Sequence, residues 1–258
     1  MTPVVIILAH ATDVGAGLVA RWLERELGVT AVRMVRPETL SLAQWSVRVD
    51  ARGRAAVRVA WQGTEPIEDC SVGAVLNRIH WLPSPRFLRS CSKDRDYAGA
   101  EFQAVVTSWL GRFSDRVVHV VRRDARLTPV LPLQHWATAA AANGLPVAAR
   151  TVTNSARALR WRAAETTSGR GASAAEEVPA GSVLVAGNQT GGLLAGRFGA
   201  SCLATARALG FPLLEFRFAS AGDETVLGDV DPLPPLVEPW AAALTGHLLA
   251  SLAAEGPS

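Results

Sequence analysis

The sequence predicts an α/β protein in which a parallel sheet comes first and antiparallel strands follow. Residues 3–8 form a short apolar run rich in valine and isoleucine, and residues 14–27 carry apolar side chains at helical spacing. A buried strand that leads into a helix and then into a second strand, at residues 31–35, is typical of a β-α-β unit. Near the end of the chain, strands at 212–218 and 225–230 lie close enough in sequence to form a hairpin.

The other elements follow from the same patterns. Between the two ends we expect a hairpin at 45–50 and 56–61, strands at 71–79, 117–121 and 146–154, helices at 96–113, 132–143 and 201–209, and hairpin arms at 182–186 and 192–195. A helix at 240–253 closes the chain. Residues 163–177 are rich in Ala, Ser, Thr, Gly and Glu with few large apolar side chains, which predicts a mobile loop.

Composition excludes several classes of function. The net charge is +3, from 26 basic and 23 acidic residues, so a nucleic-acid partner is not expected. Lys93 is the single lysine, and a mechanism that needs two ammonium groups cannot operate. The three cysteines are widely spaced and predict reduced thiols rather than a zinc site. No signal-peptide pattern opens the sequence and no segment suits a bilayer, so we expect a cytoplasmic protein without a membrane partner.

Three segments, in order, carry a resemblance to a known family. The first comprises Asn77-Arg78 at a strand end followed by residues 94–101. The second is residues 134–154, with a Gly-Leu-Pro-Val turn and a Thr-Asn ending. The third pairs Leu-Gly-Phe-Pro-Leu-Leu-Glu at 209–215 with Leu-Gly-Asp-Val-Asp-Pro at 227–232. Together they resemble the ATP-grasp ligases that modify peptides in bacterial natural-product pathways, including maturation of ribosomally synthesised and post-translationally modified peptides (RiPPs).

The resemblance implies two domains and a magnesium site. Residues 1–125 correspond to a pre-ATP-grasp (Rossmann-like) parallel sheet domain, and residues 126–258 to a degenerate ATP-grasp-like α+β domain. In the family, three residues at the final strand pair hold the magnesium ions that bridge the ATP phosphates, and these positions are Glu215, Asp229 and Asp231 here. Their alternative interpretation is a hairpin with ordinary surface acids.

The resemblance also implies that the ATP-binding middle of the family is missing. Some 28 residues separate the Thr-Asn ending from the next family-like strand, which leaves no room for the subdomain that supplies lysine to the phosphates. Four arginines, Arg150, Arg157, Arg160 and Arg197, could replace the lysine because guanidinium groups bind phosphate well. Their alternative interpretation is a solvated helix face or ion pairs.

Other candidate residues lie where an α/β sheet binds ligands. Asn77, Arg78, His80 and Trp81 follow a predicted strand at its carboxyl end. Asp13 is expected to cap the first helix rather than to bind an anion. Cys202 lies among alanines and leucines and is interpreted as a buried structural cysteine rather than a nucleophile.

Three hypotheses about function follow. The first is a degenerate ATP-grasp-like pseudoenzyme that binds a peptide or a pathway protein without ATP. The second is an active ATP- and Mg²⁺-dependent carboxylate–amine ligase that acts through an acyl phosphate. The third is an enzyme with chemistry unrelated to ATP. Loss of the central subdomain favours the first hypothesis. That loss should also leave an apolar sheet face uncovered, which predicts a homodimer or a stable hetero-complex.

Overall fold

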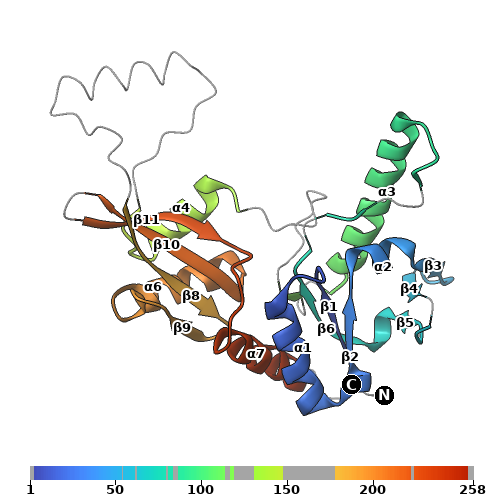
Figure 1. Ribbon diagram of the computed structural model, residues 1–258, viewed down its shortest axis with the longest axis horizontal. Coiled ribbons are helices and arrows are strands. Elements are labelled where there is room, and N and C mark those ends of the chain that lie inside the picture. The colour runs from blue at the N-terminus through green and yellow to red at the C-terminus, as the bar shows by residue number, and fades with distance from the viewer. Residues whose placement is uncertain are drawn as a thin grey trace.

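The computed structural model describes most of the chain, and Figure 1 shows its arrangement. The described residues are 3–53, 55–61, 63–79, 81–83, 87–113, 117–118, 131–147, 178–221 and 224–254. They form three sheets and the helices that pack on them. The predicted loop at 163–177, the predicted strand from 148 to 154 and the predicted domain boundary after residue 125 lie outside the described residues.

A four-stranded parallel sheet forms the centre of the N-terminal unit (Figure 1). Its strands, in spatial order, are β2 (Val32–Val35), β1 (Val4–Leu8), β6 (Val72–Asn77) and β7 (Val117–Val118). β1 and β6 lie inside the sheet because their aliphatic side chains are buried on both faces. Helix α1 (Val14–Leu27) begins after Asp13, whose side chain accepts a hydrogen bond from the Ala16 backbone N–H at 2.9 Å. The predicted capping role of Asp13 is therefore confirmed.

A three-stranded antiparallel sheet stands beside the parallel one. Its elements and neighbours are β3 (Gln44–Val49), β4 (Ala55–Ala60), β5 (Ile67–Glu68), helices α2 (Pro37–Leu42) and α3 (Ser92–Gly111), and the 3-10 turns η1 (Val29–Ala31) and η2 (Asp69–Ser71). Trp45 of β3 packs edge-on against Trp109 of α3, with ring centres 5.3 Å apart. This contact joins the small sheet to α3.

The C-terminal unit is an antiparallel sheet with helices on one face. Its strands, in spatial order, are β11 (Glu224–Asp231), β10 (Leu213–Ala221), β8 (Val178–Ala186) and β9 (Gln189–Gly191). Helices α4 (Leu133–Ala142) and α6 (Ala195–Leu209) pack against it. Phe198 of α6 stacks on Phe218 of β10 with ring centres 4.6 Å apart, which fixes α6 on that face.

The last helix, α7 (Trp240–Ala254), returns to the N-terminal unit and packs on α1 (Figure 1). Leu244 and Leu248 of α7 share a buried core with Leu23 of α1 and with Leu184 of β8. The contact with the C-terminal sheet is close, because a Cβ atom at Gly191 would overlap the ring of Trp240. The two units are thus connected by a common core and not by a linker alone.

Most elements lie where the sequence predicts them, but strand β5 is not among the predictions and α6 begins six residues before its predicted start at Ser201. α1 spans the predicted residues, and β10, β11 and α7 agree within a few residues. The predicted strand at 192–195 is wrong, because β9 lies earlier, at Gln189–Gly191, and α6 begins at Ala195. Helix α2 was not predicted. Within the described residues, no helix is long and apolar enough to span a bilayer.

Candidate functional site

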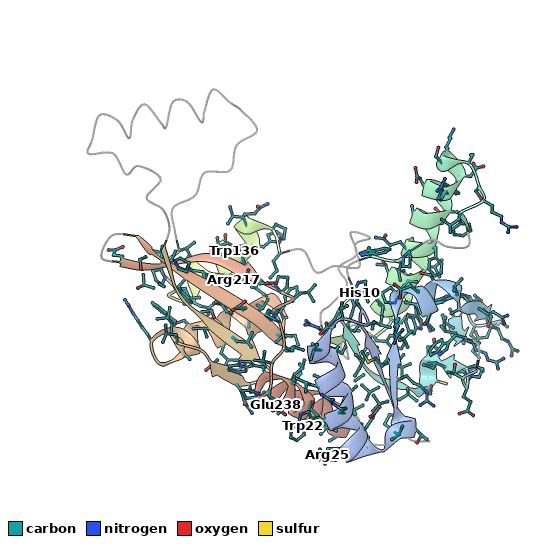
Figure 2. All side chains as sticks on the ribbon, viewed as in Figure 1. His10, Trp22, Arg25, Trp136, Arg217 and Glu238 are labelled. Carbon is teal, nitrogen blue, oxygen red and sulfur yellow. The ribbon has the colours of Figure 1, made fainter. Side chains whose placement is uncertain are left out.

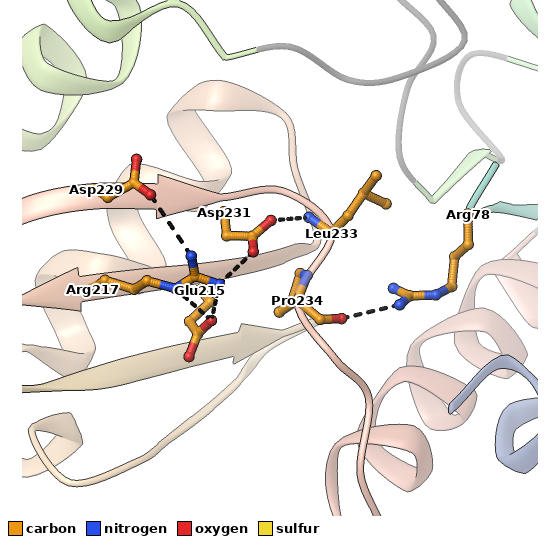
Figure 3. A network of polar contacts seen from close by, with 7 residues as sticks. All are labelled: Arg78, Glu215, Arg217, Asp229, Asp231, Leu233 and Pro234. Carbon is orange, nitrogen blue, oxygen red and sulfur yellow. Dashed lines mark hydrogen bonds and ion pairs between the residues drawn. The ribbon is translucent and has the colours of Figure 1, made fainter. Parts of the chain in front are cut away.

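Four charged side chains meet on the C-terminal sheet, and we name them the charged cluster: Glu215, Arg217, Asp229 and Asp231 (Figure 3). Figure 2 shows Arg217 on this sheet. Arg217 Nη2 lies 2.9 Å from Glu215 Oε2 and 2.5 Å from Asp231 Oδ2. Nε of the same arginine donates a second hydrogen bond to Glu215 at 3.0 Å, and Nη1 lies 3.8 Å from Asp229 Oδ2. The arginine therefore contacts all three acids.

Strand register brings the charged cluster together. Glu215 lies directly opposite Asp231 across β10 and β11, and Arg217 lies directly opposite Asp229. Because side chains alternate along a strand, Glu215 and Arg217 share the face opposite to the one on which Phe216 packs against the helices. All four charges therefore point away from α4 and α6.

The exposed part of this face is charged rather than apolar. The side chain of Arg217 is 45% exposed and that of Asp229 is 60% exposed. The charged cluster is therefore not an apolar face, and the expectation of an uncovered apolar sheet face stays a prediction. Charged side chains are stable in contact with water because water solvates them.

The acids change the proton affinity of the arginine. Partial burial alone would lower the pKa of Arg217, but the hydrogen bonds that it donates to Glu215 and the negative charges of Asp231 and Glu215 outweigh this effect and raise that pKa above its ordinary value. Arg217 is thus a cation at neutral pH. With three carboxylates around it, the cluster carries a formal charge of −2 when all groups are ionised.

As they stand, the three predicted magnesium ligands do not fit a metal ion. Glu215, Asp229 and Asp231 do come together, but they surround a guanidinium group that occupies the space between them. Mg²⁺ requires near-octahedral oxygen coordination at short distances, which a bound guanidinium prevents. Among the described residues, no group of three or more His, Cys, Asp and Glu side chains is arranged to hold a metal. The magnesium assignment stays a prediction.

The linker between β11 and α7 connects the charged cluster to the N-terminal unit (Figure 3). The Leu233 backbone N–H donates to Asp231 Oδ1 at 2.8 Å. One residue later, the carbonyl oxygen of Pro234 accepts a hydrogen bond from Arg78 Nη2 at 3.1 Å. A continuous series of polar contacts therefore runs from the C-terminal sheet to the end of β6.

Arg78 anchors the other end of this series. Its Nε donates to Asp13 Oδ2 at 2.6 Å, and the pair lies largely buried at the start of α1. The backbone of Arg78 is held as well, since its N–H donates to the Leu8 carbonyl at 2.8 Å. Next to it, the rings of His10 and Trp81 lie 6.0 Å apart. Arg78 and Trp81 are thus brought to one place, together with two residues that follow β1.

Of the remaining predicted ligand-binding residues, the structure describes Asn77 and Arg197. Asn77 is the last residue of β6 and is buried, with its side-chain oxygen accepting from the Ile79 N–H at 3.4 Å. Arg197 lies on α6, where its guanidinium covers the Phe198 ring and Nη1 lies 3.5 Å from Thr225 Oγ1. His80 and Arg150 lie outside the described residues, as do Arg157 and Arg160.

Cys202 is a structural residue, as the sequence predicts. The side chain is fully buried in the core beneath α6, and this burial raises the pKa of its thiol to about 12. A thiol with that pKa is not a nucleophile at neutral pH.

Sequence reasoning missed Arg217 and the pairing of Asp13 with Arg78. Arg217 could have been found, because it stands two residues after Glu215 on a strand and must share its face. The Asp13 pairing could not, because 65 positions separate it from Arg78 and only the parallel pairing of β1 with β6 brings them together.

Comparisons with known proteins identify the fold. No family model and no curated protein matches the chain. Among solved structures, the chain is similar to the macrocyclase MdnC from Microcystis aeruginosa MRC bound with the precursor peptide MdnA, with 13% identity and a TM-score of 0.70 over 97% of this chain and 100% of that one. The fold is ATP-grasp-like.

Two further structures support this ATP-grasp-like assignment. A RiPP-associated ATP-grasp ligase from Chryseobacterium gregarium, in complex with ADP and a leader and core peptide, is 10% identical with a TM-score of 0.72, over 99% of this chain and 98% of that one. ATP-grasp ligase PsnB, complexed with a phosphomimetic variant of a minimal precursor, Mg and ADP, is 14% identical with a TM-score of 0.67, over 97% of this chain and 99% of that one. Because the matches span nearly all of both chains, they do not single out a missing subdomain, and that absence stays a prediction.

Proposed function

We propose that this chain is a degenerate ATP-grasp-like protein of a bacterial RiPP or related tailoring pathway, which binds a peptide or a pathway protein without ATP-dependent chemistry. The similarity to ATP-grasp ligases supports the pathway, because the compared structures hold precursor, leader or core peptides. A peptide partner for this chain is carried over from those proteins as part of the proposal.

The position of Arg217 is the observation that carries the proposal. ATP-grasp catalysis relies on positive charge held at the phosphates, since phosphoryl transfer depends mainly on positioning and electrostatic stabilisation. Here the acids that the resemblance assigns to magnesium already have a cation of the chain's own. A triphosphate with its metal would have to displace Arg217 from hydrogen bonds of 2.5 to 3.0 Å.

Calorimetry with ATP·Mg²⁺ tests the non-catalytic part of the proposal. We expect no binding tighter than about 1 mM, because the triphosphate meets carboxylates rather than an open metal site. Micromolar affinity that depends on magnesium would overturn this part. Synthetic peptides corresponding to the short reading frames beside the gene test the other part, with micromolar binding in the absence of nucleotide as the expected result.

The ligase hypothesis keeps one observation in its favour. The three predicted ligands lie on adjacent strands within reach of one guanidinium, which supports the positions that the resemblance assigns to them. An active ligase would release ADP or phosphate in the presence of its peptide, and mass spectrometry would detect loss of one water from the peptide. We expect neither signal.

Assembly is the remaining part of the proposal. We propose a homodimer or a stable complex with another pathway protein. Light scattering at low micromolar concentration distinguishes these states from a monomer of 27.3 kDa. A monomeric chain with which no pathway protein co-purifies would contradict the proposal.

A further inference from the structure

Arg78 has an unused hydrogen-bond donor in a buried place. Its side chain is 7% exposed, Nε is bonded to Asp13 and Nη2 to the Pro234 carbonyl. Nη1 is buried and has no hydrogen-bond partner among the described residues. A buried donor without an acceptor costs about 1–3 kcal/mol, and more when the group is charged. Such a donor calls for an explanation, and an acceptor supplied by a bound molecule is one that the position of Arg78 can test.

The place is one where open α/β sheets bind ligands. The strand order β2-β1-β6-β7 puts β2 on one side of β1 and β6 on the other, so the chain changes direction between β1 and β6. Ligands bind outside the carboxyl ends of the strands at such a switch point. Arg78 follows β6 directly, and Asp13 follows β1 at the start of α1. The unused donor thus lies at the switch point of this sheet.

The charges at this point favour a neutral acceptor over an anion. Asp13 already balances the charge of Arg78 at 2.6 Å, and the same carboxylate caps α1. What Nη1 needs is therefore an oxygen lone pair and not a second counter-charge. Bringing a full carboxylate charge out of water to a balanced pair costs several kcal/mol, whereas an amide carbonyl is much less costly to desolvate.

The neighbouring side chains suit a peptide. Trp81 is 54% exposed, and one face of its ring is held near His10 at 6.0 Å between centres. Exposed indole rings provide contact area for peptide segments at a small cost in side-chain entropy. Trp81 stands three residues after Arg78, so the aromatic surface and the donor belong to one loop.

We propose that the switch point between β1 and β6 binds an amide carbonyl oxygen of a peptide, which accepts a hydrogen bond from Arg78 Nη1 while Trp81 contacts the adjoining segment. This inference rests on the proposed function, for which it names a binding site. Because Nη1 is covered in the free chain, the carbonyl must displace part of its cover.

Nuclear magnetic resonance with two small probes of the same shape tests the inference. Acetamide and acetate are each titrated to about 200 mM at constant ionic strength, and the Arg78 Nε–Hε and Trp81 indole signals are followed. We expect a saturable shift of both signals with acetamide and a shift at least threefold smaller with acetate. A larger response to acetate, or no response to either probe, would overturn the inference.

Matched variants assign the response to Arg78. Arg78→Lys keeps a cation beside Asp13 but removes the guanidinium fork, and we expect it to abolish the shift at the Trp81 indole. Arg207→Lys, on α6, makes the same exchange at an exposed position away from the site and should leave the shift unchanged. If Arg78→Lys does not fold, the response of the Arg78 Nε–Hε signal in the wild type still shows whether the probe binds at Arg78. Peptide binding by the whole chain is measured separately, so failure of the proposed function and failure of this site give different results.

Discussion

Replacing Arg217 by glutamine is expected to destabilise the protein and to create a divalent-cation site. The variant leaves Glu215, Asp229 and Asp231 without their shared cation, at a formal charge of −3. Exposed ion pairs contribute about 0.2–1 kcal/mol each, and the pair at 3.8 Å to the exposed Asp229 belongs at the bottom of that range. The expected loss of unfolding free energy at pH 7 is therefore about 1–2 kcal/mol. That loss corresponds to a decrease in Tm of roughly 2–8 °C.

Magnesium should restore much of this loss in the variant but not in the wild type. Three oxygen ligands without dedicated geometry bind with a Kd of about 1 mM, so 10 mM Mg²⁺ should stabilise the variant by about 1.4 kcal/mol. Thermal unfolding with and without Mg²⁺ measures both effects. Arg207→Gln is the matched control, because Arg207 is exposed and bonds to Asn188 rather than to an acid. A variant as stable as wild type, or one indifferent to Mg²⁺, would refute the reasoning.

Three further predictions concern packing and titration. Gly191→Ala should lower the free energy of unfolding by about 1–3 kcal/mol, because the new Cβ overlaps the Trp240 ring. Gly196→Ala has free space in a helix and should be neutral or stabilising. Equal melting temperatures for the two variants would contradict this prediction. Burial lowers the pKa of His247, so the folded state favours its neutral form. The free energy of unfolding should therefore be unaffected by this residue above about pH 6.5 and should fall as the pH drops below that value. His247→Gln should flatten this part of the pH profile measured by chemical denaturation. The Cys202 thiol should react with a disulfide reagent only after unfolding, unlike the two exposed cysteines, and a third fast thiol would disprove its burial.

Local patterns were sufficient to predict the elements whose sequence and environment agree. α1 has a capping residue, an apolar stripe and a glycine after its end, and its bounds were predicted correctly. α6 was placed six residues too late because residues 192–195 were assigned to a hairpin strand. In the structure, Gly199 lies inside the helix where a side chain would overlap Thr190, so this glycine serves a tertiary contact.

The candidate site could be predicted only in part, because some of its contacts depend on tertiary structure. The family resemblance brought three acids of β10 and β11 together, and strand register explains why they meet. The group between the three acids is the guanidinium of Arg217. Its contact with them can be predicted only after the two faces of β10 have been assigned. The pairing of Arg78 with Asp13 depends on β1 and β6 being neighbours in the sheet, and no local sequence pattern encodes that arrangement.

The return of α7 to the N-terminal unit determines when that unit can finish folding. As the chain leaves the ribosome, β1, α1, β2 and β6 emerge early, but the apolar surface that Leu244 and Leu248 cover stays open until the last helix appears. Domains usually fold as units during synthesis, beginning at the N-terminus. Here one side of the first sheet stays uncovered until α7 has been synthesised, and during that time it is open to chaperones and to a premature contact with a partner.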